Sequence, residues 1–171
     1  MVQGRRKRLA YRRRRSGETD YHRRSRLLRA RKPRAVVRVS NTQITCQLVN
    51  YVASGDEVLV NVNGNTLVKK YAWPESSSRK SLPASYLVGY AMGKAASAAG
   101  HEEAVLDIGL AASTPGSRIF AALKGMVDAG MDIPHGESAL PDEDRLNGAH
   151  ISEDVAAQVE GTRKKIEGAF E

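Results

Sequence analysis

Carboxylate and imidazole side chains gather near residue 105, and they are the first candidates for catalytic chemistry. His101, Glu102 and Glu103 are adjacent, Asp107 ends an apolar run, and Asp128 follows later. Two carboxylates within reach of one divalent ion can activate water, so these residues raise the hypothesis of a metal-dependent nuclease. Adjacent residues point in different directions, however, and no second ligand group lies at helical spacing. We therefore expect no metal centre, no catalytic residue and a structural role for Asp107, whose carboxylate would anchor nearby backbone amides or Arg118.

Residues 114–118 and Cys46 are the other candidates for chemistry. The segment TPGSR at 114–118 lies between a predicted strand and a predicted helix, where free amides and an arginine could hold a phosphate. It matches neither glycine-rich phosphate-binding fingerprint, so a turn with a Ser117 cap is favoured. Cys46 is the single cysteine of the chain, which excludes an intramolecular disulfide, and we expect it to be a small buried side chain.

Basic residues are concentrated at the N-terminal end. The chain has 171 residues, with 27 Lys and Arg against 19 Asp and Glu, and a formal net charge of +8. Sixteen of the basic residues lie in the first 38 positions, where the acidic residues are Glu18 and Asp20. Clustered positive charge gains free energy by releasing counterions from phosphates, and arginine, which predominates here, also stacks on bases. The pattern predicts an RNA-binding arm.

Other classes of partner fit the composition less well. A membrane-surface helix needs large apolar side chains opposite its basic face, and the residues before Tyr21 offer few of them. We find no apolar run long enough to cross a membrane, and arginines stand where a secretory signal would be apolar. We therefore expect no membrane partner, no small-molecule substrate, no cofactor and a cytoplasmic location.

Three strands are predicted by apolar side chains that alternate with polar ones. Turns at residues 40–42 and 53–56 would join them as an antiparallel meander. The side chains expected on the buried face are Ala35, Val37, Val39, Ile44, Cys46, Leu48, Val58, Val60 and Val62. The opposite face is polar and partly basic, and would face water or a partner.

Helices are predicted around these strands by their caps. A short arm helix would start at a Thr19 cap, and longer helices would start at Ser81, Ser117 and Ser152. In the helix after Ser81, Gly89 and Gly93 would permit close packing. The apolar segment 104–108, between two helices, predicts a further strand.

The expected fold class is therefore α/β. A mixed sheet, formed by the antiparallel three-strand meander plus a further strand reached by a helical crossover, would be flanked by helices and preceded by a basic N-terminal arm. We divide the chain into the arm and its short helix at 1–32, an α/β core at 33–137, and an acidic loop with a C-terminal helix at 138–171. Residues 1–18 lack apolar periodicity, so we expect order to begin at Thr19.

Five segments of the sequence carry a resemblance to a known protein family. They are RRRRSGETDYHRR at 12–24, KPRAVVRVSN at 32–41, LVKKYAW at 67–73, AVLDIGLAASTPGSRIFAALKGMVDAGMDIPHGE at 104–137 and PDEDR at 141–145. Together they resemble the family of the eighteenth large-subunit ribosomal protein in its archaeal and eukaryotic form. The resemblance implies a structural constituent of the large ribosomal subunit. Such a protein binds 5S rRNA and links it to the 23S-type rRNA in the central protuberance, beside neighbouring large-subunit ribosomal proteins, and it is not an enzyme.

The resemblance also implies where RNA binds: the arm, the polar sheet face with its turn, and one further basic segment. The residues expected to contact RNA are Arg5, Arg6, Lys7, Arg8, Tyr11, Arg12, Arg13, Arg14, Arg15, Tyr21, Arg23, Arg24, Arg26, Arg34, Arg38, Ser40, Asn41, Thr42, Gln43, Gln47, Lys69, Lys70 and Tyr71. Because Arg38 is expected to be an exposed strand residue, Arg38→Glu should weaken RNA binding and leave thermal stability nearly unchanged. The alternative hypothesis is an RNA-processing enzyme with a carboxylate site near Asp107.

Overall fold

A four-stranded mixed sheet forms the centre of the computed structural model, which describes residues 9–170. The strands are β1 (Arg34–Val39), β2 (Ile44–Asn50), β3 (Glu57–Asn63) and β4 (Val105–Asp107), and their order in the sheet is β3-β2-β1-β4. The first three pair antiparallel, and β4 pairs parallel to β1. This topology confirms the predicted meander with a further strand reached by a helical crossover.

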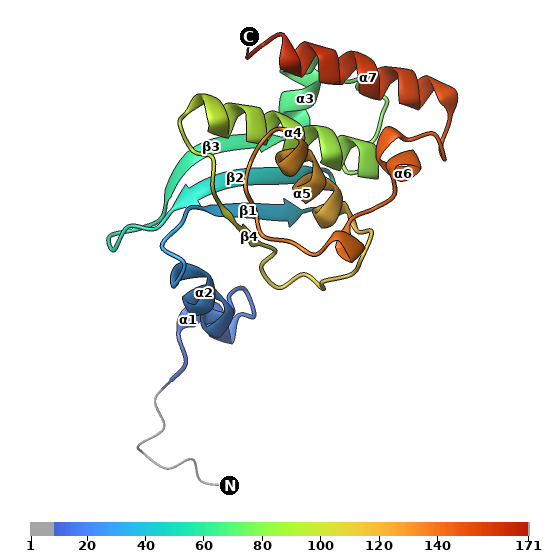
Figure 1. The fold of residues 1–171 in the computed structure, drawn as a ribbon. Coiled ribbons are helices and arrows are strands. Elements are labelled where there is room, and N and C mark those ends of the chain that lie inside the picture. Colours follow the sequence, from blue (N-terminus) through green and yellow to red (C-terminus); the bar gives the residue numbers. More distant parts are fainter. Residues whose placement is uncertain (1–8, 171) are drawn as a thin grey trace, which may run out of the picture.

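Helices cover one face of this sheet (Figure 1). The helices that follow the arm are α3 (Gly64–Tyr71), α4 (Leu82–Ala98), α5 (Arg118–Asp128), the 3-10 helix η1 (Glu137–Ala139), α6 (Glu143–Asn147) and α7 (Glu153–Glu167). The long helix α4 packs on β2 and β3, α5 packs on β1, and α7 lies against α4. Figure 1 shows the arm helices α1 (Arg12–Arg15) and α2 (Tyr21–Leu28) outside this layer, near the end of the sheet where β1 begins.

The strand alternation places most of the predicted apolar side chains in the core. Ala35, Val37 and the β2 side chains Ile44, Cys46 and Leu48 are fully buried. Val58 is the exception, because it is half exposed and pairs with Val49 of the opposite face. The register shifts between Leu48 and Val49, and this bulge changes the alternation of β3 by one residue. The prediction for Val58 is therefore wrong.

Glycines allow α4 and α5 to cross at very short distance. A Cβ atom added at Gly89 would lie 2.0 Å from the carbonyl oxygen of Ala122, and one added at Gly125 would lie 2.2 Å from that of Tyr86. A Cβ added at Gly93 would meet the Ala129 Cβ at 2.6 Å. The close packing predicted for Gly89 and Gly93 is confirmed, and Gly125 is the matching position on α5 that the sequence analysis missed.

The helix caps follow the predictions in part. The Ser81 and Ser152 hydroxyls accept from the backbone amides of Ala84 and Val155, as expected. Ser117 precedes α5, but its side chain makes no cap hydrogen bond. Helix α2 is capped by Asp20 rather than Thr19, because the Asp20 carboxylate accepts from the amides of both His22 and Arg23.

Candidate nucleic-acid interface

The sheet face opposite α4 and α5 carries the polar side chains of the strands, and the N-terminal arm lies beside it. A cleft of about 560 Å³ separates the arm from this open face. The arm residues that line the cleft are Arg13, Glu18, Thr19, Asp20, Tyr21, Arg23, Arg24 and Leu27. Its sheet and loop residues are Arg34, Val36, Arg38, Gln47, Val49, Asp56, Val58, Asp107, Gly109 and Leu110. The arm and the open face therefore form one composite surface.

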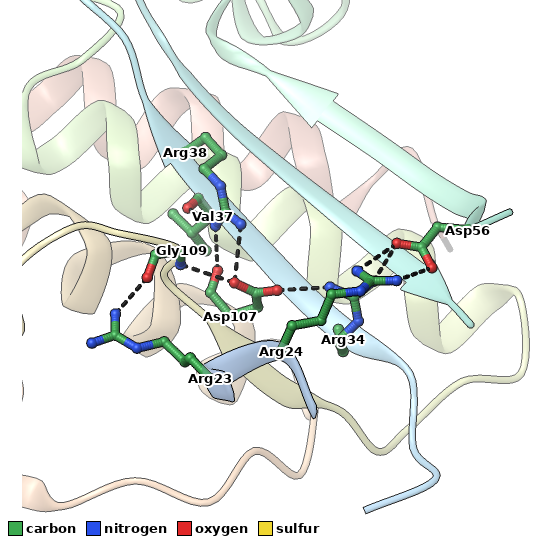
Figure 2. A network of polar contacts seen from close by, with 8 residues as sticks. All are labelled: Arg23, Arg24, Arg34, Val37, Arg38, Asp56, Asp107 and Gly109. Atoms are coloured by element: carbon green, nitrogen blue, oxygen red, sulfur yellow. Dashed lines mark hydrogen bonds and ion pairs between the residues drawn. The ribbon is translucent and has the colours of Figure 1, made fainter. Parts of the chain in front are cut away.

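Charged side chains cross this cleft in a chain of alternating sign (Figure 2). Both terminal nitrogens of Arg24 in α2 donate hydrogen bonds to the carboxylate of Asp56 in the β2–β3 loop, at 2.7 and 2.8 Å. Arg34 of β1 donates to Asp56 at 2.6 Å and to Asp107 of β4 at 2.7 Å. Arg38 completes the chain with an Nη2 to Oδ1 distance of 3.0 Å to Asp107. The network joins α2, the hairpin loop, β1 and β4.

Asp107 is held by its neighbours as a structural carboxylate. Its Oδ1 accepts from the amide of Gly109 at 2.9 Å, and its backbone carbonyl accepts from Arg38 at 2.6 Å. The predicted anchoring of a backbone amide is confirmed, whereas Arg118 is not the partner. Arg34 and Arg38 take that place because the parallel pairing puts Asp107 opposite Val36, between these two β1 residues.

The alternative of a carboxylate metal site finds no support around Asp107. Its carboxylate oxygens face two guanidinium groups, which compete for the positions a divalent ion would need. Among the described residues, no group of three or more His, Cys, Asp or Glu side chains is arranged to hold a metal ion. Cys46 is buried, and its burial raises the pKa of the thiol far above the usual range.

The ion pairs shift the pKa values of both carboxyl groups. Hydrogen bonds from Arg24 and the charge of Arg34 hold the pKa of Asp56 below its ordinary value. For Asp107, burial is the largest single effect and raises the pKa, but Arg38, the Gly109 amide and Arg34 together outweigh it and lower the pKa. Both carboxyl groups therefore stabilise the fold above their ordinary pKa of about 4, and this contribution is lost as the pH falls through the folded values.

We expect Asp107→Asn to lower the free energy of unfolding by about 2 kcal/mol at pH 7, because one buried partner of Arg34 loses its charge. The difference from wild type should shrink as the pH falls below the ordinary carboxyl pKa and through the lower folded pKa of Asp107, where the wild-type carboxyl group is also neutralised. Urea unfolding across this pH range measures both values. Asp132→Asn, which changes an exposed carboxyl group, is the matched control and should have little effect. Equal stability of Asp107→Asn and wild type at pH 7 would contradict the structural role.

Several exposed arginines of the arm have no carboxylate partner within the part of the chain that the structure describes. Arg13 pairs with Glu18 at 3.1 Å, and Tyr11 packs on Tyr21 with ring centroids 5.0 Å apart. We define the arginine surface as the exposed arm arginines whose guanidinium forms neither an ion pair nor a hydrogen bond with any other described residue: Arg12, Arg14, Arg15, Arg26, Arg29 and Arg31. Its charge is available to phosphates.

The arm is helical earlier than expected. Helix α1 forms a single turn at Arg12–Arg15, ahead of the predicted start of order at Thr19. Backbone bonds from Glu18 and Thr19 to the Arg13 carbonyl close the turn, together with the Arg13 side-chain bond to Thr19. Such local polar contacts are not visible in apolar periodicity, which is why the sequence analysis missed the turn.

Most of the remaining predicted RNA contacts lie on the surface. Arg5, Arg6, Lys7 and Arg8 lie outside the described residues. Arg23 is exposed and donates to the Gly109 carbonyl, while Gln47 lines the cleft. The exposed turn residues Ser40, Asn41 and Thr42 follow β1, at the opposite end of that strand from the arm. The side-chain oxygen of Gln43 accepts a hydrogen bond from the backbone amide of Asn65. Lys69 and Lys70 are exposed on the last turn of α3.

Two of the predicted contact residues have buried side chains. Tyr71 is only 7% exposed and belongs to the hydrophobic core, because its position on α3 turns the ring inward. Arg34 is 3% exposed, and its guanidinium forms ion pairs with Asp56 and Asp107. We correct the prediction for both residues: neither presents its side chain to a partner on this surface.

The prediction for Arg38→Glu also needs correction. About half of the Arg38 side chain is exposed, but its guanidinium bonds the Asp107 carboxylate and the carbonyls of Val37 and Asp107. A glutamate here would face Asp107 and remove these bonds. The substitution would therefore lower stability as well as binding, and Arg26, which is exposed and unpaired among the described residues, is the better test position.

Over residues 9–170, no helix combines the length and the apolar character that a membrane crossing requires.

An open sheet face, flanked by arm arginines that have no ion-pair partner among residues 9–170, is typical of an α/β protein of the RNA-binding class. Comparison with known proteins narrows this class. The family model described as "Ribosomal large subunit proteins 60S L5, and 50S L18" matches residues 5–99 and 90–136. The chain belongs to this family of large-subunit ribosomal proteins, which are structural rRNA-binding proteins and not enzymes.

Three archaeal relatives illustrate the similarity, and each is a large ribosomal subunit protein uL18. The one from Korarchaeum cryptofilum is 49% identical over 152 residues, covering 89% of this chain and 76% of the relative. The one from Methanothrix thermoacetophila is 45% identical over 172 residues, covering 98% and 100%. The one from Methanoculleus marisnigri is 50% identical over 153 residues, covering 90% and 86%. The predicted family is confirmed.

Proposed function

We propose that the chain binds 5S rRNA and links it to the large-subunit rRNA in the central protuberance, with neighbouring large-subunit proteins as further partners. The observation that carries the proposal is the arginine surface, whose exposed guanidinium groups have no carboxylate partner among the described residues. Membership of a large-subunit ribosomal protein family supports an rRNA as the polyanion.

The two parts of the surface would contribute differently to binding. Arginines on α1 and α2 neutralise phosphates and release counterions, which gives affinity without sequence preference. Polar side chains such as Gln47 and the residues of the 40–42 turn can bond base edges and ribose hydroxyls of unpaired nucleotides. The exposed rings of Tyr11 and Tyr51 offer stacking surfaces. Specificity for 5S rRNA would then arise from the sheet side, and affinity from the arm.

The RNA-binding residues that we propose are the predicted ones without Arg34 and Tyr71, together with Tyr51 as a stacking surface. Arg38 and Arg24 remain in this set with a double role, because each is bound to a carboxylate while still lining the open cleft. A guanidinium has five donors and can bond a carboxylate and a phosphate at the same time.

We expect Arg26→Glu to weaken 5S rRNA binding about tenfold, since a phosphate contact is replaced by a repulsive charge. Filter binding to 5S rRNA and to an unrelated RNA of equal length measures the effect. Lys165→Glu is the matched control, because it makes the same charge change on exposed residue 165 of α7 and should alter binding by less than about twofold. Equal weakening by both variants would show that net charge, and not the arginine surface, governs binding.

A further inference from the structure

Two carboxylates lie within the surface that we propose to bind RNA. Asp56 and Asp107 line the cleft between the arm and the open sheet face. A carboxylate there repels phosphates, so a surface shaped only for polyanion affinity would lack it. Asp107 is largely buried within the sheet, whereas the Asp56 side chain is 29% exposed on the β2–β3 loop. If Asp56 lies in an RNA-binding surface, it must make a favourable contribution to binding that outweighs its repulsion of phosphates.

Asp56 is the principal polar link between the arm helix and the sheet. Both terminal nitrogens of Arg24 bond to it, which is the geometry of a bidentate ion pair (Figure 2). Beyond this pair, the polar contact from α2 side chains to the sheet region is the bond from Arg23 to the Gly109 carbonyl, within the described residues. Arg24 also lies over the Tyr51 ring, 5.9 Å from its centroid.

Helix α2 has little else to hold it in place. It is eight residues long, and none of its residues is fully buried. An isolated helix of this length is marginal in water, so its position depends on the contacts it makes with the sheet. The side chains of Tyr21, Leu27 and Leu28 are half buried and provide apolar contact. The Arg24–Asp56 ion pair fixes the orientation of the helix.

We propose that Asp56 is a positioning residue for RNA binding: through Arg24 it docks α2 on the open sheet face and presents the arginine surface in a fixed geometry. The inference rests on the proposed function and adds a role for an acidic residue. Preorganised arginines lose less conformational freedom on binding, and this gain offsets the repulsion from one carboxylate.

A substitution of Asp56 can test the Arg24 contact without leaving another buried charge unpaired. Arg34 keeps its bond to Asp107 when Asp56 is neutralised, so no buried arginine loses all its partners. Glu57, the next residue, is exposed and forms no ion pair with any residue from 9 to 170. Asp56→Asn and Glu57→Gln therefore remove the same charge from adjacent positions, and only the first removes the anchor of Arg24.

Of the two substitutions, only Asp56→Asn should weaken RNA binding. We expect Asp56→Asn to weaken 5S rRNA binding about three- to tenfold, although it removes a repulsive charge. Glu57→Gln should leave the affinity unchanged or tighten it by less than about twofold. Asp56→Glu, which keeps the charge, should retain more affinity than Asp56→Asn. Tighter binding by Asp56→Asn, matching Glu57→Gln, would overturn the proposal.

A double-mutant cycle separates positioning from general destabilisation. In an Arg24→Ala background the anchor has no partner, so Asp56→Asn should no longer weaken binding. An equal loss in both backgrounds would show a purely structural role and overturn the proposal. Limited trypsin digestion of the RNA-free protein gives a second readout, since Asp56→Asn should speed cleavage at the α2 arginines. Unchanged cleavage would also count against it.

The same series distinguishes this inference from the proposed function. If Arg26→Glu weakens 5S rRNA binding and Asp56→Asn does not, the positioning role is wrong and the RNA-binding surface stands. If wild type shows no preference for 5S rRNA, the proposed function itself fails.

Discussion

Deletion of residues 1–18 is expected to weaken RNA binding roughly a hundredfold at physiological salt while the rest of the protein stays folded. The deleted segment holds eight of the sixteen basic residues in the first 38 positions. If about four of them contact phosphates, each contributes a slope of about −0.7 to −0.9 in the dependence of log K on log salt. Filter binding over a salt series should therefore show a slope that is flatter by about three.

The structure explains why stability should survive this deletion. Every described residue before Thr19 is exposed, and the α1 contacts stay within the arm, at Glu18, Thr19 and Tyr21. Replacing Arg12, Arg14 and Arg15 by lysine is the matched control, because it keeps the charge and should keep the slope. An unchanged slope after deletion would show that residues 1–18 make no phosphate contacts.

Gly89→Ala should be the most destabilising single substitution considered, and we expect it to lower the free energy of unfolding by about 3 kcal/mol. The new Cβ would lie 2.0 Å from the Ala122 carbonyl oxygen and 2.7 Å from its carbon, so the backbones of α4 and α5 must separate. Both helices are lined with core residues at this crossing, and separation would open the packing on both sides. For a chain of this size, such a loss lowers the thermal midpoint by about 10 °C.

Gly161→Ala is the control for this substitution. A Cβ at Gly161 would meet no atom within 4 Å, and alanine is the better helix former, so the midpoint should stay the same or rise slightly. A Gly89→Ala protein as stable as the Gly161→Ala protein would contradict the close crossing of α4 and α5.

Much of this fold is predictable from local patterns in the sequence. Alternation in the strands identified the buried face of β1 and β2, and the serines before α4 and α7 marked the helix starts. These signals are local, because a side chain's direction depends on the strand or helix period around it. Small residues in α4 also indicated a close neighbour, but the period of one helix does not tell which helix that is.

The errors lie where distant residues decide the structure. Val58 was misplaced because a bulge depends on how β3 registers against β2, and this pairing is not visible within β3 alone. Arg34 and Arg38 were expected on the open face as RNA contacts, and they do lie on that side. Their ion pairs with Asp56 and Asp107 join residues 22 and 69 to 73 positions apart in the chain, so spacing could not reveal them.

The proposed binding of 5S rRNA is tested most directly by purifying the native protein with its bound nucleic acid, under mild salt, and sequencing the RNA. We expect 5S rRNA to be strongly enriched over other RNAs of similar length, together with fragments of the large-subunit rRNA. Recovery of mixed RNA without enrichment of 5S rRNA would contradict the proposed function.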